Sequence, residues 1–385
     1  MSPPASFLLR GRVLTPARDL AEASVRVEEG RVKWIRRGRL DPAGAELIDQ
    51  PGLVIVPGFV DLQVNGFAGH DAMGGVDSIK AIAAALPSSG VTAFLPTAIT
   101  AGLERLAAFV VEVESARRLD RAGSARILGA HIEGPFLEPG RRGAHDASLM
   151  LPPTTANLDR LLASGPPRLL TLAPELPGAL AAIRRLAALG VVVSAGHSGA
   201  GVQAARDGLA AGVGFGTHLF NAMSGLEHRN PGLAAALLED GRVVTGLIAD
   251  GHHVDPVLLA LAIRLKGARR VALTTDQTAA AGMPPGRYQL GDRAVVSDGE
   301  TVRLADGTLA GSVATMDRLV GLVAGLPGVG LRAAVEMATA TPASVLGGGG
   351  GLGRLRAGGR ADITVLDRSG AVLMTLIGGR VGFRR

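Results

Sequence analysis

Short apolar runs recur through the middle of the chain, and five of them stop at residues that can bind a metal ion or move a proton. The runs end at His131–Glu133, His197, His218, Asp250–His253 and Asp276. Uninterrupted apolar runs are typical of strands in parallel sheets, which are buried on both faces. In barrels of such strands, functional side chains lie at the carboxyl ends of the strands. The pattern therefore predicts parallel strands that share one site.

Stretches rich in Ala, Leu and Arg lie between the apolar runs, and their composition favours helices. Helices are expected at 78–86, 103–117, 176–189 and 256–265. Strands that alternate with helices over nearly 290 residues are typical of βα units, and a closed (β/α)₈ barrel fits that length. We therefore predict a (β/α)₈ barrel that carries the catalytic site over residues 57–346.

The two ends of the chain have a different pattern, with short strand-like segments separated by turn residues. Strands are expected at 8–14, 23–27, 31–35, 361–367 and 372–377. Two unrelated flaps are the alternative, but short isolated strands are only marginally stable. We therefore predict one small β-sandwich domain composed of residues 1–56 and 347–385. The five glycines at 347–351 are expected to form a flexible connection into it.

Composition narrows the classes of protein that remain. The net charge of +6 is modest for 385 residues, aromatic residues are few, and no run of consecutive basic residues occurs. These features do not favour a nucleic-acid or membrane partner. The N-terminal segment lacks the apolar core of a signal peptide, and no stretch approaches the roughly 18 apolar residues of a membrane span. We therefore expect a cytoplasmic protein.

The chain contains no cysteine, so any metal ion must be held by histidine and carboxylate side chains. A single histidine at a strand end is more often a satisfied polar residue than a ligand. Glu133, His197 and His218, however, stand at the ends of three of the five apolar runs, one after another along the chain. One carboxylate and two imidazoles with an open position are typical of a catalytic site for zinc or a similar divalent ion.

Asp276 ends the last strong apolar run, and two interpretations are open. Aspartate is a good N-cap for a following helix. It is equally suited to act as a general base. Next to a metal site on neighbouring strands, the general-base interpretation is favoured.

Arg229 lies in a polar loop at 227–232, soon after His218. A solvated loop arginine is the simplest interpretation. The alternative is capture of an anion, because the guanidinium group matches the geometry of phosphate. His253 and backbone donors near Asn221 and Ala222 could assist.

These residues belong to a longer ordered series of motifs. The motifs begin at Pro57 (PGFVDLQVNG), His131 (HIEGPF), Gly143 (GAH), Ser194 (SAGHS), Thr217 (THLFNAM), Arg229 (RNPG), Ala249 (ADGHHVD), Thr275 (TD) and Gly307 (GTLAGS). With this set, spread from about residue 51 to 367, the chain resembles the N-acetylglucosamine-6-phosphate deacetylases of the amidohydrolase superfamily. The resemblance implies the same barrel and β-sandwich, and the release of acetate from an amino-sugar phosphate.

The resemblance also implies roles for individual residues. Glu133, His197 and His218 would hold the metal ion, Asp276 would be the general base and then the acid, and His145 would hydrogen-bond the substrate. The 6-phosphate would be held by Asn221, Ala222, Arg229 and His253, and the acyl group would lie against Leu309 and its neighbours up to Ser312. In relatives the arginine can come from the neighbouring subunit, so a homodimer is implied.

Many amidohydrolases carry His-x-His at the end of the first barrel strand, but this chain has Gln63-Val64-Asn65. Amides are poor ligands for a transition metal compared with imidazole. We therefore expect one divalent ion, with Zn²⁺ favoured and Fe²⁺, Mn²⁺ or Co²⁺ as alternatives. Gln63 is expected to contact the attacking water. His252 is expected to be at the surface or behind the site, and His70 is given no role.

Two other functions remain as alternatives. One is an amidohydrolase acting on another substrate, including the galactosamine epimer of the sugar phosphate, because one or two loop contacts can decide that preference. The other is a protein that only binds a metal ion or a sugar phosphate. That hypothesis predicts loss of the base or of a ligand, and the sequence retains all four residues.

Overall fold

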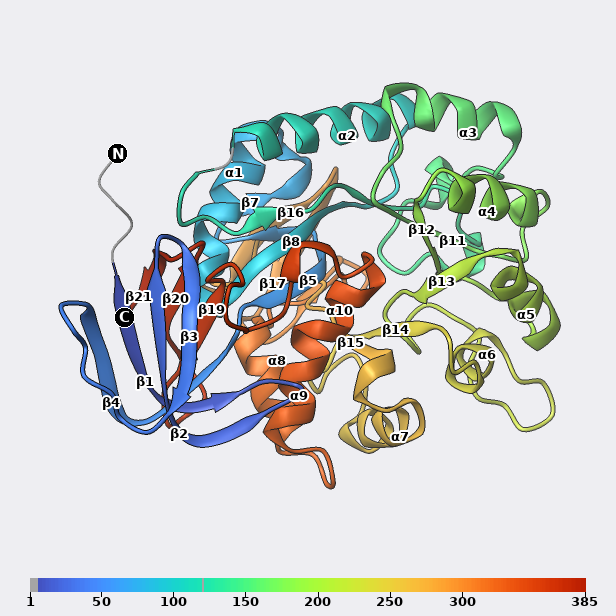
Figure 1. The fold of residues 1–385 in the computed structure, drawn as a ribbon. Coiled ribbons are helices and arrows are strands. Elements are labelled where there is room, and N and C mark those ends of the chain that lie inside the picture. The colour runs from blue at the N-terminus through green and yellow to red at the C-terminus, as the bar shows by residue number, and fades with distance from the viewer. Residues whose placement is uncertain (1–5, 120) are drawn as a thin grey trace.

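The computed structural model describes residues 6–119 and 121–385 as two sheet systems side by side (Figure 1). The strands of the terminal sheet lie at the left of the view, and the helices and strands of the barrel fill the right. Residues 1–5, which were included in the predicted β-sandwich domain, lie outside the described residues. Within the described ranges, no helix is long and apolar enough to cross a membrane.

The predicted barrel is confirmed. Eight parallel strands follow one another in the order of the sequence, and a short ninth strand pairs with the second of them. These strands are β5 (Phe59–Val64), β8 (Val91–Ala98), β9 (Arg126–Ile127), β10 (His131–Glu133), β11 (Leu169–Leu172), β12 (Val192–Ala195), β13 (Val213–Gly216), β14 (Val244–Leu247) and β15 (Val271–Leu273). Every residue of β8 is buried, as expected for a strand covered on both faces.

The barrel closes beyond the end of its last strand. The backbone N–H of Asp276 donates to the Gln63 carbonyl at 3.0 Å, and Asn65 N–H donates to the Gln277 carbonyl at 2.9 Å. Val64 and Gln277 form the isolated parallel bridge between the first and last strands. Closure therefore fixes the two segments that carry Gln63, Asn65 and Asp276 against each other.

Helices cover the outside of the barrel (Figure 1). They are α1 (Val76–Ala85), α2 (Leu103–Arg118), α3 (Thr155–Leu161), α4 (Ala179–Ala188), α5 (Val202–Ala211), α6 (Leu233–Glu239), α7 (Pro256–Lys266), α8 (Met316–Ala324), α9 (Gly330–Ala338) and α10 (Ala340–Val345). Each of the four predicted helices is present with bounds shifted by a few residues. Helix α4 begins at Ala179, after the left-handed Gly178, and buries Ala182, Ile183 and Leu186 on one face.

The prediction that both ends of the chain build one β domain is confirmed. The sheet has seven strands in the order β21-β20-β19-β4-β1-β2-β3. Its strands are β1 (Phe7–Leu14), β2 (Asp19–Glu28), β3 (Arg31–Arg37), β4 (Glu46–Pro57), β19 (Ile363–Leu366), β20 (Val372–Ile377) and β21 (Arg380–Arg384). Strands β1 and β4 run parallel and the other neighbours antiparallel. Strands from both termini share one apolar core.

Two small antiparallel sheets lie near the carboxyl ends of the barrel strands. One is the pair β6 (Gly66–Phe67) and β7 (His70–Asp71). The other comprises β16 (Gly286–Leu290), β17 (Arg293–Ser297) and β18 (Val302–Arg303). Asp71 joins them, because one of its carboxylate oxygens accepts the Gly291 N–H at 2.9 Å. Leu290, at the end of β16, is thereby held over the mouth of the barrel.

Candidate metal centre

Three potential ligands meet at the carboxyl ends of the barrel strands. Glu133 is the last residue of β10, and His197 and His218 each follow the end of their strand, β12 and β13, by two residues. The Glu133 Oε1 atom lies 3.2 Å from His197 Nε2 and 2.9 Å from His218 Nε2, and the two imidazole nitrogens are 3.1 Å apart. All three residues are buried. They form the one such metal-capable cluster in the described part of the chain.

The hydrogen bonds of His197 make this cluster suited to a cation. His197 Nδ1 lies 2.9 Å from the backbone carbonyl of Arg141, which can only accept, so Nδ1 carries the proton. In a neutral His197, Nε2 then turns a lone pair toward the Glu133 carboxylate and His218. Lone pairs that face one another at this distance are stabilised by a cation, so the donor set fits a divalent metal ion.

The backbone at the site adopts an uncommon conformation. His197, His218 and Asp276 have positive φ angles of 48°, 29° and 50°. Side chains other than glycine rarely adopt this left-handed region, and such residues cluster at functional sites. The turn after each strand therefore directs these three side chains back over the barrel mouth.

Asp276 lies beside the potential metal ligands and is held by an amide. Asn65 Nδ2 donates to Asp276 Oδ1 at 2.6 Å. Burial, together with the nearby charge of Glu133, raises the pKa of the Asp276 carboxyl to about 6. Burial acts on Glu133 in the same direction, but the surrounding imidazoles of His145, His197 and His218 outweigh it and hold the Glu133 pKa well below its usual range. The two carboxyl groups thus differ in their affinity for a proton.

His145 presents a neutral N–H to the same space. Its Nδ1 accepts the backbone N–H of Thr100 at 3.1 Å, so the proton of a neutral ring is on Nε2. Burial and the neighbouring His197 lower the pKa of the His145 imidazole to about 4. Nε2 lies 3.6 Å from Glu133 Oε2, at the edge of the cluster. The ring can therefore donate a hydrogen bond without carrying a charge.

Gln63 lies behind the cluster rather than in the cavity. Its Nε2 donates to Glu133 Oε1 at 3.1 Å, and it is not among the residues that line the cavity. Gln63 Oε1 and Asn65 Oδ1 are buried and have no hydrogen-bond partner among the described residues. Both amides therefore donate to carboxylates, and the expectation that Gln63 contacts the attacking water stays a prediction.

A cavity of about 310 Å³ opens over the cluster and contains most of the predicted site residues. Its lining includes Glu133, His145, His197, His218, Asn221, Ala222, His253, Asp276 and Leu309. His253 is fixed by Asp250, whose Oδ2 lies 2.7 Å from His253 Nδ1. Ile99, Ile248 and Leu290 add apolar surface beside Leu309. One cavity thus combines potential metal ligands, proton donors and acceptors, and an apolar wall.

Arg229, like Gln63, is a predicted site residue that does not line this cavity. It is exposed, in the loop between β13 and α6. His252 and His70 are exposed as well, and neither lines the cavity. Arg229 is therefore not part of the cavity wall in the single chain.

Sequence reasoning missed two groups of polar residues that support the site. His131 is fully buried one layer below Glu133, with Nε2 at 2.9 Å from Thr171 Oγ1 and Nδ1 at 3.1 Å from the Leu62 carbonyl. Burial lowers the pKa of His131 to about 4, so it is a neutral part of the barrel interior. Asp61 is the other, and its Oδ2 accepts the Thr275 hydroxyl at 2.6 Å. Alternation along the strand places His131 and Glu133 on one face, but it does not separate a ligand from a core residue.

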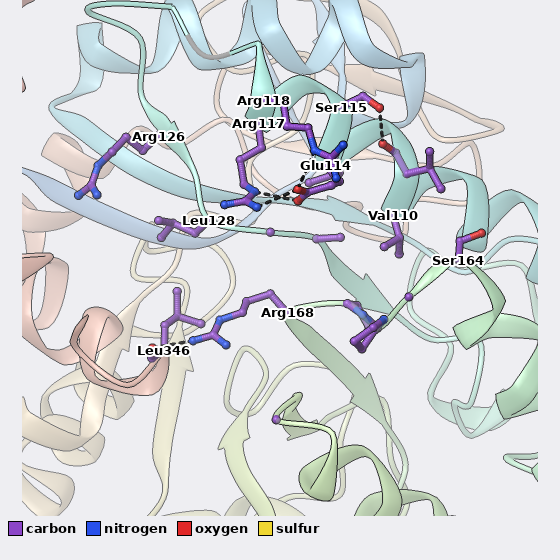
Figure 2. A pocket seen from close by; sticks show the side chains of 18 of the residues that line it. Val110, Glu114, Ser115, Arg117, Arg118, Arg126, Leu128, Ser164, Arg168 and Leu346 are labelled. Carbon is purple, nitrogen blue, oxygen red and sulfur yellow. Dashed lines mark hydrogen bonds and ion pairs between the residues drawn. The ribbon is translucent and has the colours of Figure 1, made fainter. Parts of the chain in front are cut away.

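A larger cavity of about 750 Å³ lies at the opposite, amino-terminal ends of the strands, and Figure 2 shows its arginines. Each labelled arginine already has a partner. Arg117 and Arg118 pair with Glu114, Arg126 pairs with Asp362 at 2.8 Å, and Arg168 donates to the Leu346 carbonyl at 2.7 Å. The cavity is larger than the one over the metal-capable cluster but contains no comparable reactive groups.

Comparison with known proteins places this geometry in a family. The amidohydrolase family matches residues 54–382. The chain is 38% identical over 360 residues to N-acetylgalactosamine-6-phosphate deacetylase of Escherichia coli O157:H7, covering 92% of this chain and 93% of that protein. It is also 38% identical over 372 residues to human N-acetylglucosamine-6-phosphate deacetylase, covering 90% of each.

Solved structures agree with these relatives. N-acetyl-D-glucosamine-6-phosphate deacetylase from Mycobacterium smegmatis, as a mutant in complex with N-acetyl-D-glucosamine 6-phosphate, superposes with a TM-score of 0.91 at 35% identity. That match covers 98% of this chain and 99% of the other. The corresponding enzyme from Thermotoga maritima gives a TM-score of 0.87 at 30% identity, over 97% and 99% of the two chains.

Proposed function

The chain belongs to the amidohydrolase family, and from this premise we propose that it hydrolyses the acetamide of N-acetyl-D-glucosamine 6-phosphate. The products are acetate and D-glucosamine 6-phosphate, so the enzyme acts in amino-sugar metabolism. The observation that carries the proposal is the cluster of Glu133, His197 and His218 in one cavity with Asp276. The relatives and solved structures support the choice of substrate.

Acetate release from a panel of sugars tests this function. We expect turnover of N-acetylglucosamine 6-phosphate and little turnover of unphosphorylated N-acetylglucosamine. The galactosamine epimer is the second candidate, because a deacetylase of that sugar phosphate is as similar to this chain as the human enzyme is. Higher kcat/KM for the epimer would reverse the assignment, and no acetate from any sugar by metal-loaded protein would reject deacetylation.

We propose that Glu133, His197 and His218 hold one divalent ion, with Zn²⁺ as the first choice. When bound, such an ion lowers the pKa of a water molecule and polarises a carbonyl group. Gln63 and Asn65 support a single ion, since their amides contact Glu133 and Asp276 where other members carry imidazoles. The residues of this chain supply the proton transfers.

Asp276 acts as the general base and then as the general acid. With its pKa raised to about 6, the carboxyl group can take a proton from water near neutral pH and return it to the departing amine. His145 donates its Nε2–H to the acetamide oxygen, where negative charge develops in the transition state. A neutral ring is suited to this task because it keeps its proton.

The remaining cavity residues position the sugar. Asn221, Ala222 and His253 are proposed to contact the 6-phosphate, and the Asp250 carboxylate beside His253 fixes the orientation of that ring. Leu309, with Leu290 and Ile99, offers apolar surface to the methyl group of the acetyl. Binding energy from the phosphate, remote from the reacting bond, serves to orient the acetamide.

We propose that Asp61 and Thr275 position Asp276, and Thr275→Val tests this. The buried Asp61 carboxylate accepts the Thr275 hydroxyl at 2.6 Å and the Gln63 N–H at 3.2 Å, so it ties the segments that carry the base and the amides. Outer contacts of this kind typically contribute about 10- to 100-fold in activity. We expect Thr275→Val to lower kcat by that factor with little change in KM.

Thr274→Val is the matched control for this variant. Thr274 precedes Thr275, is equally buried, and its hydroxyl has no partner among the described residues. Removing an unpaired buried hydroxyl should leave kcat nearly unchanged. Equal effects of the two substitutions would assign them to packing and remove the positioning role of Asp61.

We propose that the enzyme is a homodimer in which Arg229 reaches the cavity of the partner. Arg229 is exposed and lies outside the cavity of its own chain. Helix α7, which packs against α6 at the end of the Arg229 loop, exposes Val257, Leu261 and Leu265 along one side. These residues recur every four positions, so they form one apolar stripe that a second copy can cover.

Mixing two impaired variants, assayed at low substrate concentration, tests the origin of the arginine. Arg229→Ala should raise KM for the phosphorylated sugar by about tenfold or more, since a charge-assisted contact is lost. If Arg229 acts in the partner's cavity, refolding Arg229→Ala with Asp276→Asn creates mixed dimers with one intact site, and activity should return. Activity no greater than the sum of the two variants would place Arg229 in its own chain.

We further propose that the reaction takes place in the cytoplasm without a nucleic-acid or membrane partner. Phosphorylated sugars are charged and do not cross membranes unaided, so the substrate is expected where it is made. The modest net charge of +6 supports the absence of a strongly basic docking surface.

A further inference from the structure

A cleft of about 630 Å³ lies between the terminal sheet and the barrel, away from the metal centre. One wall is formed by the turn between β1 and β2 with Ile35 of β3. The other wall is formed by α9, α10 and the segment at 354–357 that leads back toward the terminal sheet. No residue that lines this cleft also lines the cavity of the metal centre.

Arginines dominate the charge of this interdomain cleft. Five arginines and one glutamate line it, which leaves four uncompensated positive charges. Arg269 lies 3.6 Å from Glu336, and Arg270 donates to the Gly241 carbonyl. Among the described residues, the side chains of Arg18, Arg354 and Arg356 have no hydrogen-bond or carboxylate partner. Their guanidinium groups are therefore available to an anion.

Neighbouring carboxylates do not neutralise these arginines. Asp19, next to Arg18 in sequence, is engaged by Arg12, with its Oδ2 at 2.6 Å from Arg12 Nη2. The arginines of the larger cavity in Figure 2 differ, because each of them is paired with a carboxylate or a carbonyl. The interdomain cleft thus has the stronger unmet demand for negative charge.

The floor of the cleft is apolar. Val13 and Leu355 are buried, and Leu20 and Ile35 are partly buried and pack against the core of the terminal sheet. An inorganic ion could pair with the guanidinium groups, but it would leave the neighbouring apolar side chains exposed to water. The cleft matches a molecule that has an anionic head and an apolar body.

We propose that this cleft binds an anionic amphiphile, a phosphate or carboxylate joined to an apolar group. Arg18, Arg354 and Arg356 pair with the head, and the apolar body covers Leu20, Ile35 and Leu355. The site is separate from the deacetylation reaction and does not depend on the proposed substrate. Both walls contribute to it, so an occupied cleft joins the terminal sheet to α9 and α10.

Calorimetric titration of the full-length, metal-loaded protein with octyl phosphate below its micelle concentration tests the proposal. We expect one site, with affinity at least about tenfold higher than for inorganic phosphate or octyl glucoside, since head and tail must both contribute. The double substitution Arg354→Gln/Arg356→Gln should weaken octyl phosphate binding by about tenfold or more. Anionic vesicles form a further arm, and binding of vesicles without binding of monomeric octyl phosphate would contradict a ligand cleft.

Arg184→Gln/Arg368→Gln is the control, because both arginines are exposed, lie outside the cleft and remove the same charge. It should leave octyl phosphate binding unchanged. Neither double variant touches the metal centre, so unchanged acetate release verifies that both are folded. Equal affinities of the two double variants for octyl phosphate would overturn the site. Competitive inhibition of acetate release by octyl phosphate, unchanged by Arg354→Gln/Arg356→Gln, would also overturn it.

Discussion

Replacing Asp276 by asparagine is expected to lower kcat by about 10²- to 10⁴-fold while KM changes little, since this is the usual contribution of a general base. Asparagine has the shape of aspartate, and its carbonyl oxygen can still accept from Asn65 Nδ2, which is 2.6 Å from Asp276 Oδ1. Only the ability to take and return a proton is lost. Acetate release at saturating substrate measures the effect.

The pH dependence of kcat provides a second measurement of the same role. Burial and the charge of Glu133 raise the pKa of Asp276 to about 6, and the base works only when it is deprotonated. Activity of the unsubstituted enzyme should therefore decline as the pH falls through this value. A divalent ion beside the carboxylate favours its charged form and moves the decline to lower pH.

Asp276→Asn should lose this acid limb along with the rate. Its residual activity should vary with pH only through other groups. Turnover close to that of the unsubstituted enzyme, or an acid limb that survives the substitution, would contradict the assignment of Asp276 as the base.

The strand-end residues could be predicted from the sequence because parallel strands impose a simple rule. Buried strands read as apolar runs, and their carboxyl ends meet at one edge. Glu133, His197 and His218 are separated by up to 85 residues in sequence, and the structure brings their ligand atoms within 3.2 Å of one another. The rule thus located the metal-capable cluster without any local motif joining its members.

The contacts that support the site could not be predicted in this way. Asn65 and Asp276 are 211 residues apart, and their hydrogen bond depends on how the last strand closes against the first. Asp61 and His131 lie inside the barrel strands. A polar residue there interrupts the apolar pattern, but the pattern does not show which residue it will hydrogen-bond. These partners depend on the register between the first and last strands where the barrel closes, and on the direction of each side chain. The periodicity of apolar residues determines neither of them.

Arg229 shows a different limit. Contacts with the rest of the protein set the conformation of a loop. The residue types in the Arg229 loop predicted only that its arginine can bind an anion, and not where that arginine lies. The structure places Arg229 on the surface, outside the cavity that its chemistry suits. The pattern of residue types within such a loop does not give the conformation that decides where its arginine lies.

Removal of the metal ion is expected to abolish acetate release, with a loss at least as large as that of Asp276→Asn. Glu133 Oε1, His197 Nε2 and His218 Nε2 lie 2.9–3.2 Å from one another, so the three proposed ligand atoms are gathered at one point. Adding Zn²⁺ back should restore activity and raise the melting temperature, since an ion that binds only the folded protein stabilises it. Melting supplies a readout that is independent of turnover.

The stoichiometry of this titration distinguishes one ion from two. The amide groups of Gln63 and Asn65 donate to Glu133 and Asp276, and amides are poor ligands for a transition metal compared with imidazole, so saturation is expected at one equivalent per chain. His218→Ala should lose the ion, whereas His253→Asn, in the same cavity but outside the cluster, should retain it. Two tightly bound equivalents, or an ion retained by His218→Ala as firmly as by His253→Asn, would show that other side chains hold the metal.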